Sequence, residues 1–340
     1  MHCVIIGFGR SNPPTKWLFD YQDIAGAAQM QAVAQINPYL VAAADLFVTS
    51  RRSPICKVPP IVFGSMPNDG GHLLLSGEEQ RALLAAEPAA KPWLRRFMGA
   101  REFLNGGERW CLWLPDLPPG ALKQLPLVRK RVEAVAAYRR ASTRAATQRL
   151  AKTPTLFGEI RQPASPYLMI PKVSSERRPI IPIGFQLPTL ISSDLCLVVP
   201  SAGLFHFGTL SSAMHMAWMR TVCGRLKSDY RYTNEIVYNN FPWPEPSDSQ
   251  RAAIESAAQA VLDTREQFPD ATLADLYDPL SMPPTLRKAH GKLDRAVDAA
   301  YSRKKFSSDA ERVAFLFERY QDIVSLLPAE KPKKTRRKQS

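Results

Sequence analysis

A segment with three prolines, VYNNFPWPEP at residues 237–246, divides the sequence into two regions with different apolar patterns. Before it, short apolar runs alternate with turns rich in Pro and Gly, which is typical of β-strands. After it, apolar residues recur at helical spacing in three segments, residues 254–268, 285–301 and 309–327. The sequence therefore predicts an α+β fold, in which a mixed α/β domain is followed by a small all-α domain.

Local signals predict individual elements before the prolines. Ser76 and Glu79 have the spacing of a capping box, which predicts a helix over residues 78–88. Apolar residues at helical spacing predict further helices over residues 126–152 and 211–226. Strands are expected at residues 1–10, 16–21, 109–116, 156–161, 167–174, 179–185, 195–200 and 204–209.

The chain is strongly basic, with 45 Lys and Arg against 31 Asp and Glu and a net charge of +14. Six of these bases lie in the last ten residues, and we expect residues 329–340 to form a disordered tail. Between residues 129 and 152, eight bases stand against one acid, and between 161 and 231 eight stand against three. This excess fits either a nucleic-acid footprint or a solvated basic surface.

Cysteine usage and hydropathy exclude several classes of protein. The five cysteines (Cys3, Cys56, Cys111, Cys196 and Cys223) are odd in number and contain no CxxC pair. This pattern excludes a disulfide scaffold and the common zinc spacings. No apolar run reaches the ~20 residues that a membrane helix needs. Residues 1–10 lack a basic segment and a long apolar segment, so we expect no secretory signal. We therefore expect a cytoplasmic protein with no membrane partner.

No complete active site is recognisable in the sequence. Two segments imitate the Asn-Pro-Pro-aromatic motif of amino-methyltransferases, in which the ring stacks on a flipped base. Asn12–Thr15 has Thr in place of the ring, and Asn37–Tyr39 has one proline instead of two. Cys223 lies near His206 and His215 in the sequence, without the spacing of a known nucleophilic site. We therefore predict no catalytic, cofactor-binding or metal-binding residue in this chain.

Two polar segments have residues suited to DNA. In residues 220–238, cations that can anchor phosphates alternate with aromatic rings: Arg225, Lys227, Tyr230, Arg231 and Tyr232. In SSERRP, residues 174–179, two arginines stand in a loop between apolar strands, where Arg can donate a bidentate pair to guanine. The alternative is that the Lys and Arg side chains of both segments pair with local carboxylates such as Glu176 and Asp229.

Long stretches of the sequence also resemble one family. They are CVIIGF, LFDY, INPYL, PPIVFGSMPNDGGHLLLS, FMGAREFLNGGERWCLWL, ASTRAATQRLA, YLMIPKVSSERR, PIIPIGF, HFGTLSSAMHMAWMR, GRLKSDYRY and NNFPWP. The resemblance is collinear and extends to about Leu327. The family is the MmeI-like group of bifunctional restriction–modification enzymes (type IIL), single chains that cut DNA and methylate adenine with S-adenosylmethionine.

The resemblance implies that this chain corresponds to the C-terminal part of such an enzyme. Residues 1–35 would be terminal strands of a truncated class I methyltransferase sheet. Residues 36–244 would be the target-recognition domain and residues 245–328 the helical C-terminal domain, followed by the tail at 329–340. The S-adenosylmethionine loop and the catalytic motif would lie upstream. The chain alone is therefore expected to bind no cofactor and to be inactive.

The resemblance also implies roles for single residues. Family positions that vary with the DNA sequence match Arg177 and Arg178, and residues 211–213. We expect Arg177 or Arg178 to contact a base edge, above all that of guanine. Ser211 could contact either type of base, and Ala213 could make at most an apolar contact with a thymine methyl group. Backbone contacts and loop ordering are assigned, mainly from charge and placement, to Ser142, Arg144, Lys227, Arg231 and Tyr232.

Three functional hypotheses follow. The first is a sequence-specific recognition module of an adenine-N6 DNA methyltransferase, with double-stranded DNA as its partner. The second is a subunit of a split, active methyltransferase whose catalytic half is a separate methyltransferase or nuclease chain. The third is a non-functional gene remnant, whose first strands lack their sheet and expose an edge that invites aggregation. A plain interaction scaffold does not explain the base-reading loops.

Overall fold

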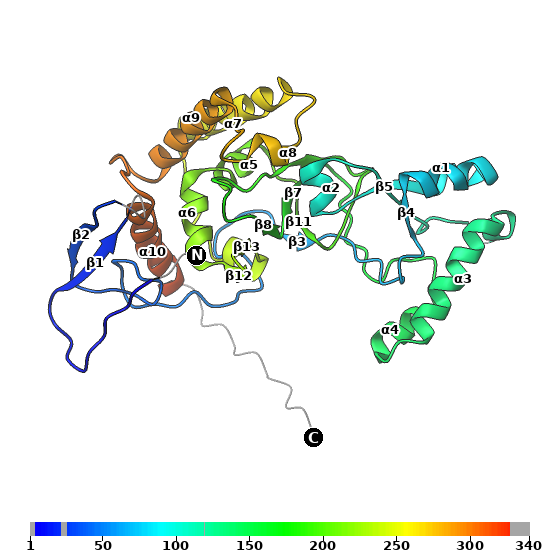
Figure 1. Ribbon diagram of the computed structural model, residues 1–340, viewed down its shortest axis with the longest axis horizontal. Coiled ribbons are helices and arrows are strands. Elements are labelled where there is room, and N and C mark those ends of the chain that lie inside the picture. The colour runs from blue at the N-terminus through cyan, green and yellow to red at the C-terminus, as the bar shows by residue number, and fades with distance from the viewer. Residues whose placement is uncertain (1–3, 22–25, 119, 327–340) are drawn as a thin grey trace.

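The computed structural model describes residues 4–21, 26–118 and 120–326, whose arrangement is shown in Figure 1. Grouped by sheet, in spatial order, the strands are β1 (Lys16–Asp20) and β2 (Gln29–Val33); β10 (Ile191–Ser192), β5 (Leu94–Met98), β6 (Arg109–Leu112) and β4 (Leu74–Ser76); β3 (Val62–Phe63), β11 (Cys196–Pro200), β7 (Tyr167–Pro171) and β9 (Gly184–Gln186); β12 (Gly224–Leu226), β13 (Asp229–Arg231) and β8 (Val173–Ser174). The helices are α1 (Gly77–Ala86), α2 (Ala100–Asn105), α3 (Pro126–Arg140), α4 (Ala145–Leu150), α5 (Leu204–Leu210), α6 (Ala213–Val222), α7 (Asp248–Glu266), α8 (Leu273–Leu276), α9 (Pro284–Tyr301) and α10 (Asp309–Ser325), with the short turns η1 (Pro88–Trp93), η2 (Ala121–Gln124) and η3 (Asn234–Tyr238).

The sheet β3-β11-β7-β9 lies at the centre and is covered on both faces. Its strands run antiparallel, with Val198 of β11 opposite Met169 of β7. Because successive side chains of a strand point to opposite faces, Leu168 and Ile170 join the large core with α5 and α6. Met169 and Val198 instead pack with Phe103 of α2 on the other face.

The sheet β10-β5-β6-β4 forms, with α1, α3 and α4, a second part that we call the α3 lobe (Figure 1). Its core includes Leu112 of β6 and Val128 of α3. The predicted capping box is confirmed: Ser76 Oγ accepts the N–H of Glu79 at 3.1 Å, and the Glu79 carboxylate accepts the N–H of Ser76 at 2.8 Å. The helix predicted over 126–152 is broken into α3 and α4.

The three helical segments predicted after the prolines are α7, α9 and α10. They pack on α5 and α6, so that one continuous core joins them to the central sheet (Figure 1). Gly208 of α5 permits this approach, because a Cβ there would lie only 3.0 Å from Ile254 of α7 and 3.2 Å from Leu293 of α9. The predicted fold class is therefore confirmed: a mixed α/β region precedes a helical one.

Several predicted strands were wrong. Residues 204–209 form α5, because packing against α7 decides the conformation although Phe205 and Phe207 have the spacing of a strand. Residues 156–161 contribute only the isolated bridge of Glu159 to Met66, and residues 179–185 reach a strand only at β9. Residues 4–9 form no strand, whereas residues 1–3 lie outside the described part.

The predicted strand at residues 16–21 is confirmed as β1, but it pairs with β2 and not with residues 4–9. The hairpin leaves large apolar side chains in solvent: Trp17 is 50% exposed, Phe19 55% and Met30 61%. Cys3 and the basic tail at 329–340 lie outside the described residues.

Candidate nucleic-acid interface

The sheet β12-β13-β8 brings together the two polar segments singled out in the sequence. Strand β13 pairs with β12 on one edge and with β8 on the other, both antiparallel. The loop at residues 175–179, which follows β8, therefore lies beside the β12–β13 turn that holds Lys227. An ion pair of 3.8 Å between Glu176 and Arg225 connects the two segments. Arg177, Arg178 and Lys227 thus come to one end of one small sheet.

The guanidinium groups of Arg177 and Arg178 bind no carboxylate or carbonyl within the described ranges. Arg177 is exposed, and Arg178 is half-buried with an unpartnered Nε. Glu176 pairs instead with Arg225, whose guanidinium carbon lies 4.2 Å from the centre of the Tyr230 ring. Local carboxylates therefore neutralise neither Arg177 nor Arg178, and both remain available to a ligand.

The structure places Ser211 and Tyr232 where their predicted DNA contacts cannot form. Ser211 is fully buried after the end of α5. Tyr232 is 3% exposed, and its hydroxyl bonds to Nε2 of His215 at 2.9 Å. Burial raises the pKa of Tyr232 well above its usual value and lowers the pKa of His215 to about 3, so both groups are neutral. Of the two roles assigned to Tyr232, loop ordering is the one its position permits.

The other residues assigned to this surface lie nearer to solvent. Lys227 and Arg231 are exposed, and Lys227 occupies the turn with a φ of 56°. Ala213, the first residue of α6, is partly exposed, and its N–H donates to Oδ1 of Asp294 at 2.7 Å. A methyl group at this position can make an apolar contact without leaving a polar group unpaired.

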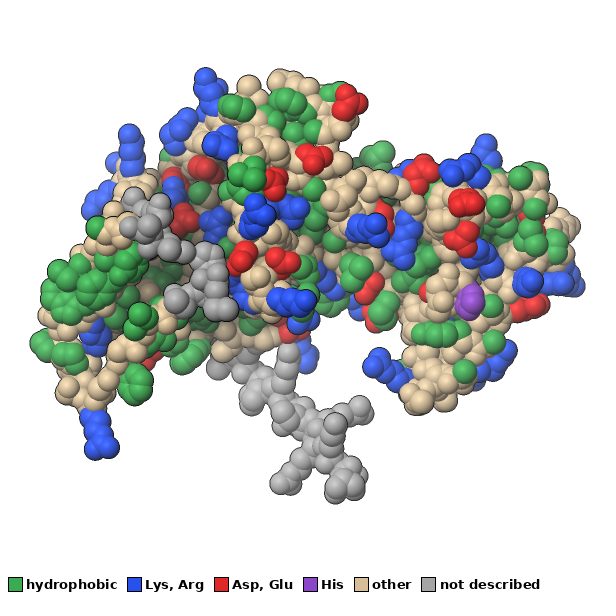
Figure 2. Space-filling view, viewed as in Figure 1, with side chains coloured by type: hydrophobic (Ala, Val, Ile, Leu, Met, Phe, Trp, Pro, Cys, Tyr) green, Lys and Arg blue, Asp and Glu red, His purple; other side chains and the backbone are tan. Residues whose placement is uncertain are grey.

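Ser142 and Arg144 lie in the turn between α3 and α4, in the α3 lobe. The hydroxyl of Ser142 accepts the N–H of Arg144 at 3.2 Å, so the serine orders the turn while the Arg144 side chain stays exposed. Arg139, just before this turn, is fully buried and does not add to the basic surface. Figure 2 shows Lys and Arg side chains on both sides of the indentation between the α3 lobe and β12–β13.

A second group of cations, which was not singled out from the sequence, lies beside this sheet. Nζ of Lys172 lies 3.9 Å from the centre of the Phe63 ring, and the guanidinium carbon of Arg161 lies 5.5 Å from the same centre. Burial lowers the pKa of Lys172, and the charges of Arg231 and Arg161 lower it further, against the opposing effect of Asp194. A phosphate would relieve this crowding of positive charge. The available signal was the position of Lys172, one residue before β8.

The residues considered for catalysis lie in different surroundings. Asn37 is buried, and its Oδ1 accepts the N–H groups of Tyr39 at 3.0 Å and Val41 at 3.1 Å. Asn12–Thr15 is exposed ahead of β1. Burial raises the pKa of the Cys223 thiol, which opposes its ionisation to a nucleophilic thiolate.

In the part of the chain that the structure describes, no three His, Cys, Asp or Glu residues gather as metal ligands. None of the described helices combines the length and the apolar character required to span a bilayer.

Comparisons with known proteins agree with this architecture. Residues 42–245 match the family model described as "MmeI, target recognition domain", and residues 246–328 match "MmeI, C-terminal domain". The chain is 40% identical over 322 residues to DNA methyltransferase A of Bacillus subtilis (strain 168). This alignment covers 94% of this chain and 36% of that protein.

A solved structure is also similar, that of the type IIL restriction-modification enzyme MmeI in complex with DNA. It aligns with 43% identity and a TM-score of 0.86 over 93% of this chain and 42% of that chain. This chain therefore spans less than half the length of either relative. It belongs to the MmeI family of type IIL restriction-modification enzymes, of which it contains the target-recognition and C-terminal domains.

Proposed function

We propose that this chain recognises a specific sequence of double-stranded DNA as part of an MmeI-like restriction-modification system. The observation that carries the proposal is the pair Arg177 and Arg178 at the end of the three-stranded sheet, whose guanidinium groups have no carboxylate or carbonyl partner among the described residues. An arginine without a protein partner can donate two parallel hydrogen bonds to O6 and N7 of guanine. Such a pair discriminates against the wrong base by about 1–3 kcal/mol.

Cations around these arginines would bind the phosphate backbone. Arg231 lies in the same sheet, Lys227 lies in its β12–β13 turn, and Lys172 lies directly before β8. Arg144 lies in the turn between α3 and α4 of the α3 lobe. Each phosphate that a cation neutralises releases condensed counterions, so these contacts add affinity and salt dependence without reading sequence. Base reading and backbone binding are thus assigned to different residues, which experiments can separate.

Selection from a random duplex library, with sequencing of the bound fraction, tests the proposal. We expect the purified chain to enrich a sequence that contains a G·C pair, and its affinity to fall steeply between about 50 and 200 mM salt. Joint substitution Arg177→Ala and Arg178→Ala should remove the preference at that pair and keep non-specific binding. Arg81→Ala, which removes an exposed arginine of α1, is the matched control. Absence of duplex binding at low salt would overturn the proposal.

We further infer that the chain serves an adenine-N6 methyltransferase that uses S-adenosylmethionine. The observation in favour is the apolar hairpin β1–β2, with Trp17, Phe19 and Met30 in solvent. Phe8, which precedes β1 in the sequence, is also 96% exposed. Figure 2 shows apolar side chains gathered on this side of the molecule. Apolar patches of this kind mark protein contacts, and the open edges of a hairpin can extend a sheet. A methyltransferase domain in the same or a separate chain would cover it.

Two measurements test this second inference. The chain alone is expected to transfer no methyl group from labelled S-adenosylmethionine to adenine in a duplex library. While no methyltransferase domain covers it, the apolar hairpin should make the chain associate with itself as its concentration rises. Joint substitution Trp17→Ser and Phe19→Ser should abolish this association in sedimentation velocity and leave duplex affinity unchanged. Methyl transfer by the chain alone would contradict this division of roles. Thermal unfolding without a cooperative transition would favour the gene remnant instead.

A further inference from the structure

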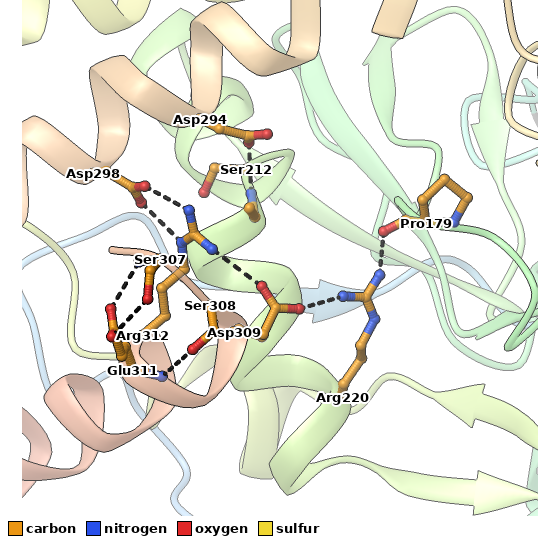
Figure 3. A network of polar contacts seen from close by, with 12 residues as sticks. Pro179, Ser212, Arg220, Asp294, Asp298, Ser307, Ser308, Asp309, Glu311 and Arg312 are labelled. Carbon is orange, nitrogen blue, oxygen red and sulfur yellow. Dashed lines mark hydrogen bonds and ion pairs between the residues drawn. The ribbon is translucent and has the colours of Figure 1, made fainter. Parts of the chain in front are cut away.

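The loop that holds Arg177 and Arg178 is hydrogen-bonded, at its C-terminal residue Pro179, to helix α6. The carbonyl of Pro179 accepts a hydrogen bond from Nη2 of Arg220, which lies in the last turn of α6. The same guanidinium donates through Nη1 to Oδ2 of Asp309 at 2.9 Å. Figure 3 shows that the fork of Arg220 reaches the loop on one side and α10 on the other.

Asp309 is in turn held by the C-terminal helices. It is the first residue of α10, and its Oδ1 accepts from Nη1 of Arg312 at 3.2 Å. Arg312 also donates twice to Asp298 of α9, at 2.7 and 3.1 Å, and this hydrogen bonding raises the pKa of Arg312. These two side chains are only 13% and 14% exposed. Bidentate pairs have a defined geometry, so α9 and α10 together orient the Asp309 carboxylate (Figure 3).

The same helices also hold the other end of α6. Asp294 of α9 accepts the N–H of Ala213 at 2.7 Å, at the first residue of the helix. Helix α6 is therefore bound to a carboxylate of α9 where it begins and to a carboxylate of α10 where it ends. Ala213 and the arginine loop, the two surface elements assigned to base reading, are both positioned from the C-terminal domain.

We propose that the C-terminal helical domain sets the sequence preference of the recognition loop through Asp309, Arg220 and the carbonyl of Pro179. Arg220 and Asp309 are then positioning residues, which act through Arg177 and Arg178 without touching DNA. The proposal rests on the proposed DNA recognition. A bidentate contact to a base tolerates a displacement of only about 0.5 Å, whereas phosphate contacts carry no sequence information. Release of the loop should therefore weaken base preference more than overall binding.

The exposure of the contacts makes this effect separable from stability. The side chains of Arg220 and Asp309 are 29% and 48% exposed, and ion pairs of that exposure contribute little to folding. Arg220→Lys keeps the charge but replaces the planar fork by a compact ammonium group, which is poorly matched to two partners at once. Asp309→Asn removes the charge and keeps the shape. Glu318→Gln, at an exposed site of α10, removes the same charge and serves as control.

The test compares base preferences selected from a random duplex library by the purified chain and its variants. Arg220→Lys and Asp309→Asn should each reduce, by about tenfold, the preference at the base pair that Arg177→Ala or Arg178→Ala also affects. Preferences elsewhere, the melting temperature and the salt dependence of binding should stay as in the native chain. In a chain already lacking Arg177 and Arg178, Arg220→Lys should change nothing further, because residues in one chain of contacts are not additive.

Each other outcome overturns the inference. Variants that select the native sequence with native preference would show that the loop does not depend on Arg220. A salt dependence weakened by about one counterion in Arg220→Gln, which removes the charge, would show a direct phosphate contact. A uniform loss of preference at every base pair, or a loss shared by Glu318→Gln, would show a general effect. A native chain that selects no sequence would overturn the proposed function and this inference with it.

Discussion

Replacement of Arg139 by methionine should lower the free energy of unfolding of the α3 lobe. Arg139 lies in the most basic part of the sequence, but it is not a surface cation. Its side chain is fully buried, and burial lowers its pKa. All of its donors are used, in five hydrogen bonds of 2.7–3.0 Å to main-chain carbonyls on both sides of α3. The acceptors are the carbonyls of Pro67, Asn68, Leu150, Thr153 and Leu156.

The expected loss follows from these five bonds. Each hydrogen bond lost costs about 1 kcal/mol, so the loss of five costs about 5 kcal/mol. The carbonyls of Pro67, Leu150 and Thr153 keep a main-chain N–H donor, whereas those of Asn68 and Leu156 lose the arginine as donor. Methionine also removes the desolvation penalty of a buried charge, which offsets part of this loss. We therefore expect Arg139→Met to lower the free energy of unfolding by about 3 kcal/mol. Arg139→Lys has three N–H donors and should fall between the variant and the native chain.

Urea denaturation followed by tryptophan fluorescence, to which Trp110 and Trp113 on the lobe's core contribute, measures this effect. Arg140→Met is the matched control, because Arg140 is the next residue and is exposed, and we expect a change below about 0.5 kcal/mol. Equal stability of Arg139→Met and Arg140→Met would refute the reasoning, since the five bonds would then contribute no more than the charge costs.

Two further predictions concern buried polar groups around α6. Burial raises the pKa of Asp294 to about 6, with Asp298 and Asp309 adding to the rise and the Ala213 N–H and Arg312 opposing it. The folded state therefore binds this proton more tightly than the unfolded chain, and its stabilising effect is lost as the pH rises through about 6. Asp294→Asn should raise the free energy of unfolding by up to about 3 kcal/mol at pH 8 and leave it unchanged below pH 4; an equal gain at both pH values would contradict the assigned cause. Tyr232→Phe should lower the melting temperature, because the hydrogen bond to His215 that it loses contributes about 1 kcal/mol, and it should leave duplex affinity unchanged. Weaker duplex binding by this variant would support the DNA contact predicted for Tyr232 from the sequence.

Local signals sufficed where an element's own residues determine its structure. The capping box at Ser76 and the apolar face of residues 285–301 predicted α1 and α9 correctly, because both depend on side chains one to two turns apart. The strand predicted at residues 204–209 failed, because its aromatic residues fit either structure and the contact of Gly208 with α7 and α9 decides for a helix. That contact joins segments far apart in the sequence, which periodicity does not report.

The candidate site was predictable to the same extent. Arg177, Arg178 and Lys227 stand out by residue type, and pairing of β8 with β13 places them together. Residue type could not reveal that Ser211 and Tyr232 are inside, because their burial arises from the packing of α5, α6 and η3 around them. Nor could composition show which arginines form hydrogen bonds and ion pairs within the protein.

The net charge therefore overstates the number of cations that can meet DNA. Arg139 binds five carbonyls, Arg131 binds two carbonyls and a carboxylate, and Arg220 binds a carbonyl and a carboxylate. None of them can bind phosphate without losing these partners. The salt dependence of duplex binding should then count cations such as Lys227 and Arg231.

A comparison of single substitutions measures this difference. Lys227→Ala and Arg231→Ala should each reduce the slope of log Kd against log salt concentration by about 1, because each removes one phosphate contact. Arg131→Gln removes the same charge from the protein and should leave the slope unchanged. If Arg131→Gln lowers the slope as much as Lys227→Ala does, the arginine must leave its carbonyls on binding, and the α3 lobe must rearrange around the duplex.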